Sequence, residues 1–447
     1  MCAIAGAIGV KNASYVVSMM LKALQHRGQE GAGIVSTDGT DFHEKRGLGL
    51  VDEVFRDTDF ASALPGAAAI GHLRYTTSGD ARSERAIQPL AVMQGKDPIA
   101  IAHNGNLTNY VKMREDYQEQ GAIFHSKSDT ELFLHLFTRA KGDRIARLKS
   151  AFSLAEGAYS LLILAKDALY AVVDPHGFRP LSFAHLNGGI VFASETCAFD
   201  LKRATGAEAI APGEMVTATD AGVSRVRFAP DGESRWCSFE QVYFARPDSV
   251  VFGTTAGVVR TRLGAALAAC APAKVDLVTA VPDSSNAIAL AYANALGVPF
   301  EFALIRNHYM GRTFITPTKA ARELGVRVKL NPVAELVRGK SVGVVDDSIV
   351  RGTTARKVVA LIREAGAREV HLRIGSPPVI HTCHWGINTP RREDLVAAVT
   401  PLESLPDVLG ADSVGYLTDA AFRGALRDTA GTRFCTTCFT GVWPIRR

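Results

Sequence analysis

Short apolar runs separated by polar turns occupy the first half of the chain. The runs "AAAIGHLRY", "PIAIAHNG" and "YSLLILAKDALYAVVD" are bounded by Gly, Asn or Asp, which is typical of β-strands. The stretch "LSFAHLNGGIVFAS" predicts a hairpin that turns at Asn187, Gly188 and Gly189. Apolar residues at helical spacing occur in "SYVVSMMLKALQH" and "SDTELFLHLFTRA". The pattern therefore predicts a first domain that is rich in sheet and carries a few helices.

From about residue 255 the pattern changes to strands that alternate with amphipathic helices. The strand candidates are "VDLVTAV", "FEFALI", "KSVGVV" and "REVHLRIGS", and the helices include "SSNAIALAYANALG" and "TTARKVVALIREAG". Nearly continuous Val, Ile and Leu in such strands indicate a parallel sheet covered on both faces. The polar stretch "RFAPDGESRW" separates the two patterns. The predicted domains are therefore 2–235 and 236–447.

Composition narrows the functional class. The 447 residues are 47% hydrophobic and 21% charged, which describes a soluble globular protein. The net charge of +5 is mild, and the sequence contains no basic block that would favour nucleic-acid binding. No apolar run approaches the length of a membrane span, and no secretory signal is evident, so we expect a cytoplasmic protein. Seven cysteines, an odd number, indicate catalysis or metal binding rather than disulfides.

The segment "KSVGVVDDSIVRGTTARKVVALIREAG" carries the strongest chemical signal. Its strand ends at Asp346 and Asp347, and a loop with Gly352 then opens a helix at Thr353 and Thr354. Small residues let backbone amides approach a phosphate, and threonine hydroxyls add donors at a helix N-terminus. The two carboxylates can accept sugar hydroxyls or hold a hard cation. An isolated turn and helix cap would look similar, but the ordered combination predicts a sugar-phosphate site at the edge of the sheet.

This combination resembles the phosphoribosyl-diphosphate (PRPP) motif of the type I phosphoribosyltransferases. The likeness extends to "AVPDSSNAIA", a strand-end loop suited to pyrophosphate, and to "NHYMGRTFITPTKAARELGVRVKL", a long cationic loop able to close over a charged substrate. The resemblance implies one Mg²⁺ per subunit at Ser284, Asp346 and Asp347. It also implies PRPP contacts from Asp283, Ser284, Ser285, Arg312, Lys319, Lys329, Asp346, Asp347, Ser348, Arg351, Gly352, Thr353 and Thr354.

Cys2 directly follows the initiator methionine and heads an apolar run. A small buried hydrophobe is the simpler interpretation of such a cysteine. Loss of Met1 alone, however, would give one residue both a thiol and a free α-amine, a nucleophile with its own base. The companion motifs "QHRGQEGAGI", "GHLRYTTSGD", "AHNGNLTN" and "SKSDTEL" resemble those of the class II glutamine amidotransferases, which have the N-terminal-nucleophile fold.

Over nearly all its length the chain resembles the family of glutamine PRPP amidotransferases, including the segments "YFARPDSV", "DPHGFRPL" and "ASETCAFD". This family implies an α+β glutaminase domain, an αββα sandwich, followed by an α/β type I phosphoribosyltransferase domain with a parallel sheet. It also implies Cys2 as the nucleophile, Asn104 and Gly105 as the oxyanion hole, and Arg74 and Asp129 as partners of the glutamine carboxylate and ammonium groups. Thr77 and His103 would support them. The family usually has "CGI" at its start, so the methyl group of Ala3 places glutaminase turnover in question.

Four of the cysteines match a ligand set. Cys435 and Cys438 form a CxxC pair, and Cys237 and Cys383 match the two remaining ligand positions of the iron–sulfur subgroup of this family. Four thiolates suit either a [4Fe–4S] cluster or a structural Zn²⁺ ion, and the resemblance favours the cluster. Cys197 and Cys270 stand among apolar residues, and we expect both in the core.

The expected reaction is glutamine hydrolysis coupled to transfer of ammonia to C1 of PRPP through a dry passage, the first step of purine biosynthesis. The family implies a homotetramer that purine nucleotides inhibit. Two alternatives remain at this point. One is a PRPP-binding or purine-sensing regulatory protein without catalysis, which would usually carry a DNA-binding helix-turn-helix that is not evident here. The other is a glutaminase that serves a different acceptor, such as a hexose or aspartate, against which the PRPP loop argues.

Overall fold

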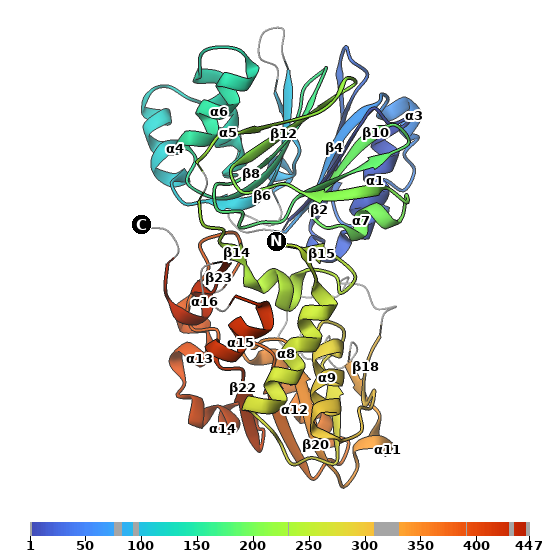
Figure 1. Cartoon of the computed structure of the whole chain (residues 1–447), viewed down its shortest axis with the longest axis vertical. Coiled ribbons are helices and arrows are strands. Elements are labelled where there is room, and N and C mark those ends of the chain that lie inside the picture. The colour runs from blue at the N-terminus through green and yellow to red at the C-terminus, as the bar shows by residue number, and fades with distance from the viewer. Residues whose placement is uncertain are drawn as a thin grey trace. The chain divides into compact units, whose positions relative to one another are not determined.

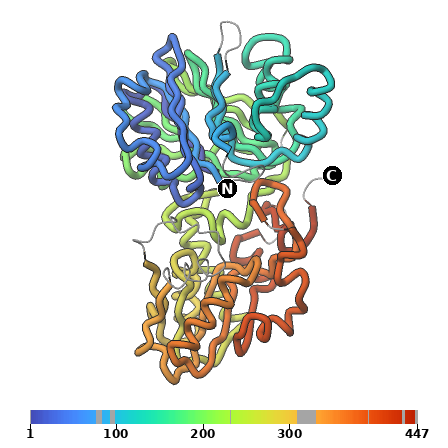
Figure 2. The backbone as a smooth tube through the Cα atoms, turned by 180° about the vertical axis from the view of Figure 1, so that it is seen from behind, coloured from blue at the N-terminus to red at the C-terminus, as the bar shows by residue number. Residues whose placement is uncertain are grey.

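The computed structural model describes residues 2–75, 83–92, 98–230, 232–307, 330–389, 391–428 and 433–443. The chain divides into two compact units. Unit 1 consists of Met1–Cys237 together with two short later segments, 248–253 and 383–388, and unit 2 holds the remainder. In Figures 1 and 2 the backbone of unit 1 runs mainly from blue to green, and that of unit 2 from yellow-green to red.

Unit 1 contains two antiparallel sheets, of seven and six strands (Figure 1). The first has the order β11 (Thr205–Ala209), β9 (Ser182–Leu186), β10 (Gly189–Ala193), β1 (Ala3–Ile8), β4 (Ala68–Arg74), β2 (Gly31–Thr37) and β3 (Phe42–Leu48). The second has the order β13 (Gly222–Arg227), β12 (Glu214–Thr219), β8 (Leu169–Val173), β7 (Gly157–Leu164), β6 (Ile99–Leu107) and β5 (Leu90–Val92). The predicted hairpin is β9 and β10, which pair through the turn at Asn187 and Gly188, both with positive φ.

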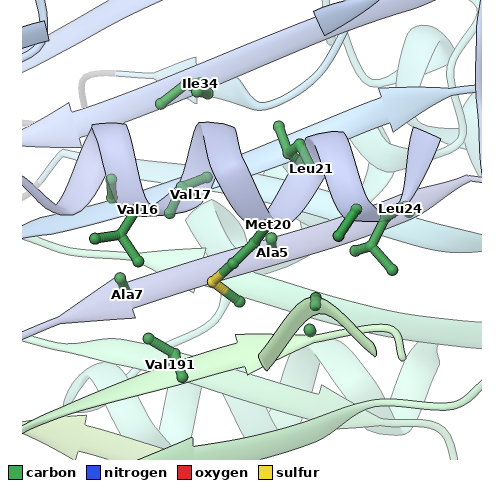
Figure 3. Close-up of a cluster of buried hydrophobic side chains, with 14 of the residues drawn as sticks. Ala5, Ala7, Val16, Val17, Met20, Leu21, Leu24, Ile34 and Val191 are labelled. Atoms are coloured by element: carbon green, nitrogen blue, oxygen red, sulfur yellow. The ribbon is translucent and has the colours of Figure 1, made fainter. Parts of the chain in front are cut away.

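Three apolar clusters make unit 1 a four-layer sandwich. Alternating residues of β1, such as Ile4 and Ile8, pack with strands of the second sheet between the two sheets. The opposite face of β1 packs against α1 (Ala13–Ala23), and Figure 3 shows Met20 of this helix beside Ala5 of the strand. The outer face of the second sheet packs against α5 (Thr130–Arg139) and α6 (Arg144–Leu154). The αββα arrangement expected from the family resemblance is therefore confirmed.

Short helices complete unit 1. These are α2 (Val51–Val54), α3 (Phe60–Ala63), α4 (Tyr110–Glu119) and α7 (Cys197–Asp200). The strand β14 (Trp236–Cys237) ends the long first part of the unit, and β15 (Val250–Val251) lies in the 248–253 segment.

Unit 2 is built on a four-stranded sheet with the order β17 (Leu277–Ala280), β20 (Ser341–Asp346), β21 (Glu369–Ile374) and β22 (Ser413–Tyr416). All three pairings are parallel, as predicted. The apolar stretch "FEFALI" departs from the expectation, because β18 (Leu304–Arg306) pairs antiparallel with β19 (Leu330–Pro332) outside this sheet. Only Phe300 forms a parallel bridge, to Val278 of β17.

Helices pack along the sheet of unit 2. The helix α12 (Thr353–Glu364) contributes Val358, Val359 and Ile362 to a core shared with β20 and β21. The helices α8 (Ala256–Cys270) and α9 (Asn286–Leu296) pack on each other, and α9 packs on β17. The smaller elements are β16 (Thr254–Thr255), α11 (Ala334–Val337), α13 (Val396–Val399), α14 (Leu405–Leu409), α15 (Asp419–Leu426), β23 (Phe434–Cys435) and α16 (Thr437–Thr440). No helix in the described part of the chain is both long and apolar enough to cross a membrane.

Candidate active sites

Cys2 lies immediately before β1 and is 8% exposed. Its thiol donates to the carbonyl of Tyr75 at 3.5 Å, and its own carbonyl accepts a hydrogen bond from Arg27 Nε at 3.1 Å. Burial raises the pKa of the Cys2 thiol. The thiol is therefore protonated near neutral pH, and a base has to remove its proton before the sulfur can attack.

The strand β6 carries His103, Asn104 and Gly105 in its buried part. A Cβ atom at Gly105 would lie 2.0 Å from the carbonyl oxygen of Ala158 on the neighbouring strand β7, so the ladder admits only glycine here. Asn104 is 1% exposed, and its side-chain Nδ2 finds no hydrogen-bond acceptor among the described residues. A buried amide with no acceptor can receive a developing oxyanion.

Asp129 precedes α5 and is nearly buried. It accepts a hydrogen bond from the backbone N–H of Leu107 at 2.9 Å, and His103 Nδ1 lies 3.6 Å from its other oxygen. Burial alone would raise the pKa of Asp129, but His103 and the backbone donors outweigh burial and lower it. Asp129 is therefore a carboxylate at neutral pH and can pair with an ammonium group.

One pocket in unit 1 brings these predicted residues together. Arg74, at the end of β4, is 4% exposed and donates from Nη1 to the carbonyl of Ser83 at 2.5 Å. The predicted residues that line the pocket are Cys2, Arg74, His103, Gly105 and Asp129. Asn104 is the immediate neighbour of two of these residues on β6. Thr77 lies outside the described residues. The pocket thus groups a thiol, a cation, an anion and the backbone of Gly105.

Sequence reasoning missed five residues that line this pocket, namely His72, Tyr75, Ala86, Gln88 and Ser128. Gln88 Oε1 accepts from the backbone N–H of His103 at 2.7 Å, and its Nε2 donates to Thr130 Oγ1 at 2.8 Å. Gln88 thus links β6 to the start of α5. His72 is fully buried on β4, two residues before Arg74. Period-two alternation places both His72 and Arg74 on one face of the strand, which was the signal available in "GHLRY".

Ala3 does not crowd the nucleophile. Its side chain is fully buried in the cluster that packs on α1. Successive residues of a strand point to opposite faces, so the Ala3 methyl lies on the side of the sheet away from Cys2 and Ile4. The departure from the family's "CGI" pattern is therefore accommodated by the core.

In unit 2, Asp346 ends β20 and Asp347 begins the following loop, and both carboxyl groups are buried. Ser284 Oγ donates to one oxygen of Asp347 at 2.5 Å, and Ser348 Oγ donates to the other at 2.6 Å. Burial and the neighbouring Asp347 raise the pKa of Asp346 well above its ordinary value, and burial also raises that of Asp347. Two buried carboxylates with few counter-charges form a donor set that a divalent cation would stabilise.

The remaining predicted PRPP residues surround this pair along the chain. Gly352 has φ of 74° and caps α12, so that Thr353 and Thr354 occupy the first helical positions and are exposed. Arg351 is exposed beside them. Asp283 pairs with Arg306 at 2.7 Å.

The Ser285 hydroxyl donates to the Val281 carbonyl, which leaves its backbone as the part able to meet a phosphate. Three predicted residues of the long cationic loop, Arg312, Lys319 and Lys329, lie outside the described residues.

The four predicted cluster cysteines divide between the units. Cys237 and Cys383 belong to unit 1, and Cys435 and Cys438 belong to unit 2. The sulfur of Cys383 accepts a hydrogen bond from the backbone N–H of Trp385 at 3.3 Å. Within the described residues, no group of three or more His, Cys, Asp or Glu side chains is placed to hold a metal ion. The four-cysteine site therefore stays a prediction. The expectation that Cys270 is in the core is wrong, because it is exposed at the end of α8, whereas Cys197 is buried.

Comparisons with known proteins agree with this division. A family model described as a glutamine amidotransferase domain matches residues 72–200. A second, described as a phosphoribosyl transferase domain, matches residues 261–374. The first model thus covers every residue that lines the pocket of unit 1 except Cys2, and the second covers the Asp346–Asp347 loop of unit 2.

Relatives and solved structures match the whole chain. The chloroplastic amidophosphoribosyltransferase of Vigna aconitifolia is 44% identical, over 100% of this chain and 91% of its own length. The amidophosphoribosyltransferase of Bacillus subtilis is 43% identical, over 99% of this chain and 94% of its own length. Among solved structures, an allosteric regulatory enzyme of purine biosynthesis matches with a TM-score of 0.95, at 42% identity and covering 100% of this chain and 96% of its own.

A further solved structure, the glutamine PRPP amidotransferase of B. subtilis complexed with ADP and GMP, matches with a TM-score of 0.94 at 42% identity. It covers 100% of this chain and 98% of its own. The chain therefore belongs to the amidophosphoribosyltransferase family, the glutamine-dependent enzymes that open purine biosynthesis.

Proposed function

We propose that unit 1 hydrolyses glutamine at Cys2 and that unit 2 uses the ammonia to displace pyrophosphate from C1 of PRPP, giving 5-phosphoribosylamine. The observation that carries this proposal is the pocket in which the Cys2 thiol is grouped with Arg74, Asp129 and Gly105. Glutamine is a zwitterion with a side-chain amide. It needs a cation, an anion, a nucleophile and an oxyanion donor, and the pocket offers one of each.

The nucleophile requires its own base. Removal of Met1 gives Cys2 a free α-amine, which takes the thiol proton as the sulfur attacks the amide carbon of glutamine. Asn104 Nδ2 and the Gly105 N–H donate to the resulting oxyanion, a contribution of roughly 3 kcal/mol per donor in comparable sites. The amine then returns the proton to nitrogen as the C–N bond breaks, and ammonia leaves. Water hydrolyses the γ-glutamyl thioester to glutamate and restores the thiol.

In unit 2 we assign PRPP to the carboxyl edge of the parallel sheet. Asp346 and Asp347 would hold Mg²⁺, and their raised pKa values support this, since a cation relieves the repulsion between them. The loop from Ser348 to Thr354 would bind phosphate through its amides and hydroxyls. Mg²⁺, when bound, supplies neutralisation of charge on the pyrophosphate leaving group. The residues of the chain position C1 of the ribose for attack by ammonia.

Three finer assignments follow from the family. A [4Fe–4S] cluster is the proposed occupant of the four cysteines, with structural Zn²⁺ as the alternative. Iron, labile sulfide and zinc contents of protein purified without oxygen decide between them. Purine nucleotides are the proposed feedback inhibitors, supported by the ADP and GMP complex of the B. subtilis relative. A homotetramer is the proposed assembly, and light scattering would test it.

The decisive experiment compares two nitrogen donors. In Cys2→Ser, we expect glutamine-dependent phosphoribosylamine formation to be lost while formation from added ammonia continues at the wild-type rate. Glutamine-dependent synthesis that survives this substitution would remove Cys2 from its role. Loss of synthesis from both donors in the wild-type protein would instead favour a regulatory PRPP-binding protein, which the enzymatic relatives do not support.

A further inference from the structure

A buried glutamate, Glu195, joins three distant segments of unit 1. It follows β10 in the "ASETCAFD" segment and is 1% exposed. Its Oε1 accepts from Arg27 Nη1 at 2.5 Å and lies 2.9 Å from His26 Nε2, and its Oε2 accepts from Ser249 Oγ at 2.6 Å. Glu195 does not line the glutamine pocket. The reaction proposed above therefore gives this carboxylate no chemical task.

Arg27 connects Glu195 to the nucleophile. The Arg27 side chain is fully buried, and while Nη1 pairs with Glu195 its Nε donates to the carbonyl of Cys2 at 3.1 Å. Next to Glu195, the backbone N–H of Ser194 donates to the Ile4 carbonyl, and Ser194 Oγ accepts from the Ile4 N–H, both at 3.0 Å. These contacts extend beyond the ladder between β1 and β10, which begins at Ala5. The start of the chain is therefore held by the Ser194–Glu195 segment and by Arg27.

Ser249 reaches the same carboxylate from the 248–253 segment. This segment belongs to unit 1, although the chain on both sides of it belongs to unit 2. Ser249 is fully buried, and the N–H of Val250 donates to Thr196 Oγ1 at 2.8 Å. The segment is thus anchored at two consecutive residues, Glu195 and Thr196.

The carboxylate stays charged in this setting. Burial would raise the pKa of Glu195, but Arg27, His26 and the Ser249 hydroxyl outweigh burial and hold it below the ordinary value. A buried ion pair is rigid only when the remaining lone pairs of the carboxylate are also bonded. Ser249 supplies the short bond on Oε2, the oxygen that Arg27 Nη1 does not use and to which the Cys197 thiol also donates, at 3.7 Å.

We propose that Glu195 is a positioning residue for the nucleophile Cys2 and that the hydrogen bond from Ser249 holds the Glu195 carboxylate in place. The 248–253 segment thereby sets the placement of Cys2 through Glu195 and Arg27. This proposal rests on the proposed role of Cys2. It gives the segments "ASETCAFD" and "YFARPDSV" a joint task, because Glu195 lies in the first and Ser249 in the second. Both act on the glutaminase step without touching glutamine.

The test removes the Ser249 hydroxyl and leaves every residue that lines the pocket unchanged. In Ser249→Ala we expect kcat for glutamine hydrolysis to fall about tenfold, the effect of one lost bond to a charged group, with KM for glutamine near the wild-type value. The rate of Cys2 alkylation by iodoacetamide, followed on the N-terminal peptide, should fall in parallel. Phosphoribosylamine formation from added ammonia should be unchanged. Ser249→Thr, which keeps the hydroxyl, should restore both rates.

Ser36→Ala is the matched control, because Ser36 is a fully buried serine of unit 1 whose hydroxyl has no hydrogen-bond partner among the described residues. Equal losses in Ser36→Ala and Ser249→Ala would show general destabilisation and overturn the proposal, as would wild-type kcat and alkylation in Ser249→Ala. Failure of the Cys2 role is separate, since it appears as glutamine-dependent activity in Cys2→Ser.

Discussion

The pKa values of two ionisable side chains in the glutamine pocket are shifted in opposite directions from their ordinary values. Burial raises the pKa of the Cys2 thiol, whereas His103 and backbone donors lower that of Asp129 despite burial. Near neutral pH the pocket therefore holds a neutral nucleophile and a fixed negative charge. In the proposed mechanism Asp129 binds the ammonium group of glutamine without a proton transfer, whereas Cys2 attacks only after its thiol has lost its proton. We therefore expect the pH dependence of glutamine hydrolysis to come from the α-amine and the thiol of Cys2.

His72 makes unit 1 sensitive to acid. Burial, with His103 and Arg74 as like charges, lowers the pKa of His72 to about 3. The unfolded chain takes up a proton near pH 6.5, whereas the folded chain does not, so the free energy of unfolding falls as the pH drops from about 6.5 toward 3. This single group accounts for up to about 1.4 kcal/mol per pH unit.

The measurement is thermal unfolding of wild type and His72→Gln over this pH range. The melting temperature of His72→Gln should fall less steeply, and parallel curves for the two proteins would contradict the shift.

The buried Asp346 carboxyl is expected to lower the stability of the metal-free protein and to bind Mg²⁺. Because burial and Asp347 raise its pKa, the free energy of unfolding falls as the pH rises from the ordinary carboxyl pKa toward the raised one. We expect Asp346→Asn to raise the melting temperature of the metal-free protein at pH 7.5, by about 2–4 °C for each kcal/mol relieved. The same substitution should abolish stabilisation by Mg²⁺ and PRPP together. The matched comparison is Asp276→Asn, an exposed carboxylate of unit 2, which should leave that stabilisation in place. A lower melting temperature in Asp346→Asn would show that the carboxylate is not strained.

At the scale of elements, the sequence predicted those features that are formed by residues close together in the chain. The path from β20 through Asp346 and Asp347 to α12 was predictable because a buried run, two acids and a Gly-Thr-Thr start follow one another within a few residues. The order of strands around β1 was not, since β1 pairs with β4 and β10, which lie far along the chain. The antiparallel pairing of β18 was missed because apolar runs of three to six residues carry no direction. His72 and Gln88 were not predicted, because the contacts that place them at the pocket join segments that are far apart in the sequence.

The 383–388 segment contacts β6, the strand that carries Asn104 and Gly105. Gly386 has φ of +98°, and a Cβ there would lie 2.9 Å from the backbone carbon of Gly105. Asn106 Nδ2 donates to the His384 carbonyl at 2.9 Å beside it. We expect Gly386→Ala to displace Gly105 and lower kcat for glutamine hydrolysis by at least about tenfold, because oxyanion donors act only when correctly placed. Synthesis from ammonia should persist.

Gly188→Ala separates this contact from backbone strain. Gly188 has a similar φ of +87° in the β9–β10 turn, and nothing lies within 4 Å of its added Cβ. Both substitutions carry the cost of a left-handed alanine, but only the one at Gly386 meets the oxyanion strand. Equal glutaminase losses in the two variants would refute the role given to the 383–388 segment.

At the scale of the whole molecule, two domains and their order were predicted from the change in hydrophobic pattern at about residue 255. What the pattern does not contain is the return of the chain to unit 1 at 248–253 and 383–388. The first segment has three consecutive apolar residues, Val250, Val251 and Phe252, and the second has none, so neither predicts an element of its own. They are held by hydrogen bonds to single buried side chains, Ser249 to Glu195 and Arg179 to the Trp385 carbonyl, and such contacts leave no periodic trace. The candidate residues were found by motif, and the residues that hold them were not.

Those two returns of the chain limit how the gene can be divided. A fragment that ends at Cys237 keeps every strand of both unit 1 sheets, yet it lacks the Trp385 carbonyl that accepts from Arg179 and the Ser249 hydroxyl that donates to Glu195. We expect such a fragment to be poorly soluble, and one extended to residue 253 to melt at a higher temperature. Chimaeras that join this glutaminase to a new acceptor enzyme would need both short segments grafted into the recipient. The module that can be transplanted is thus discontinuous.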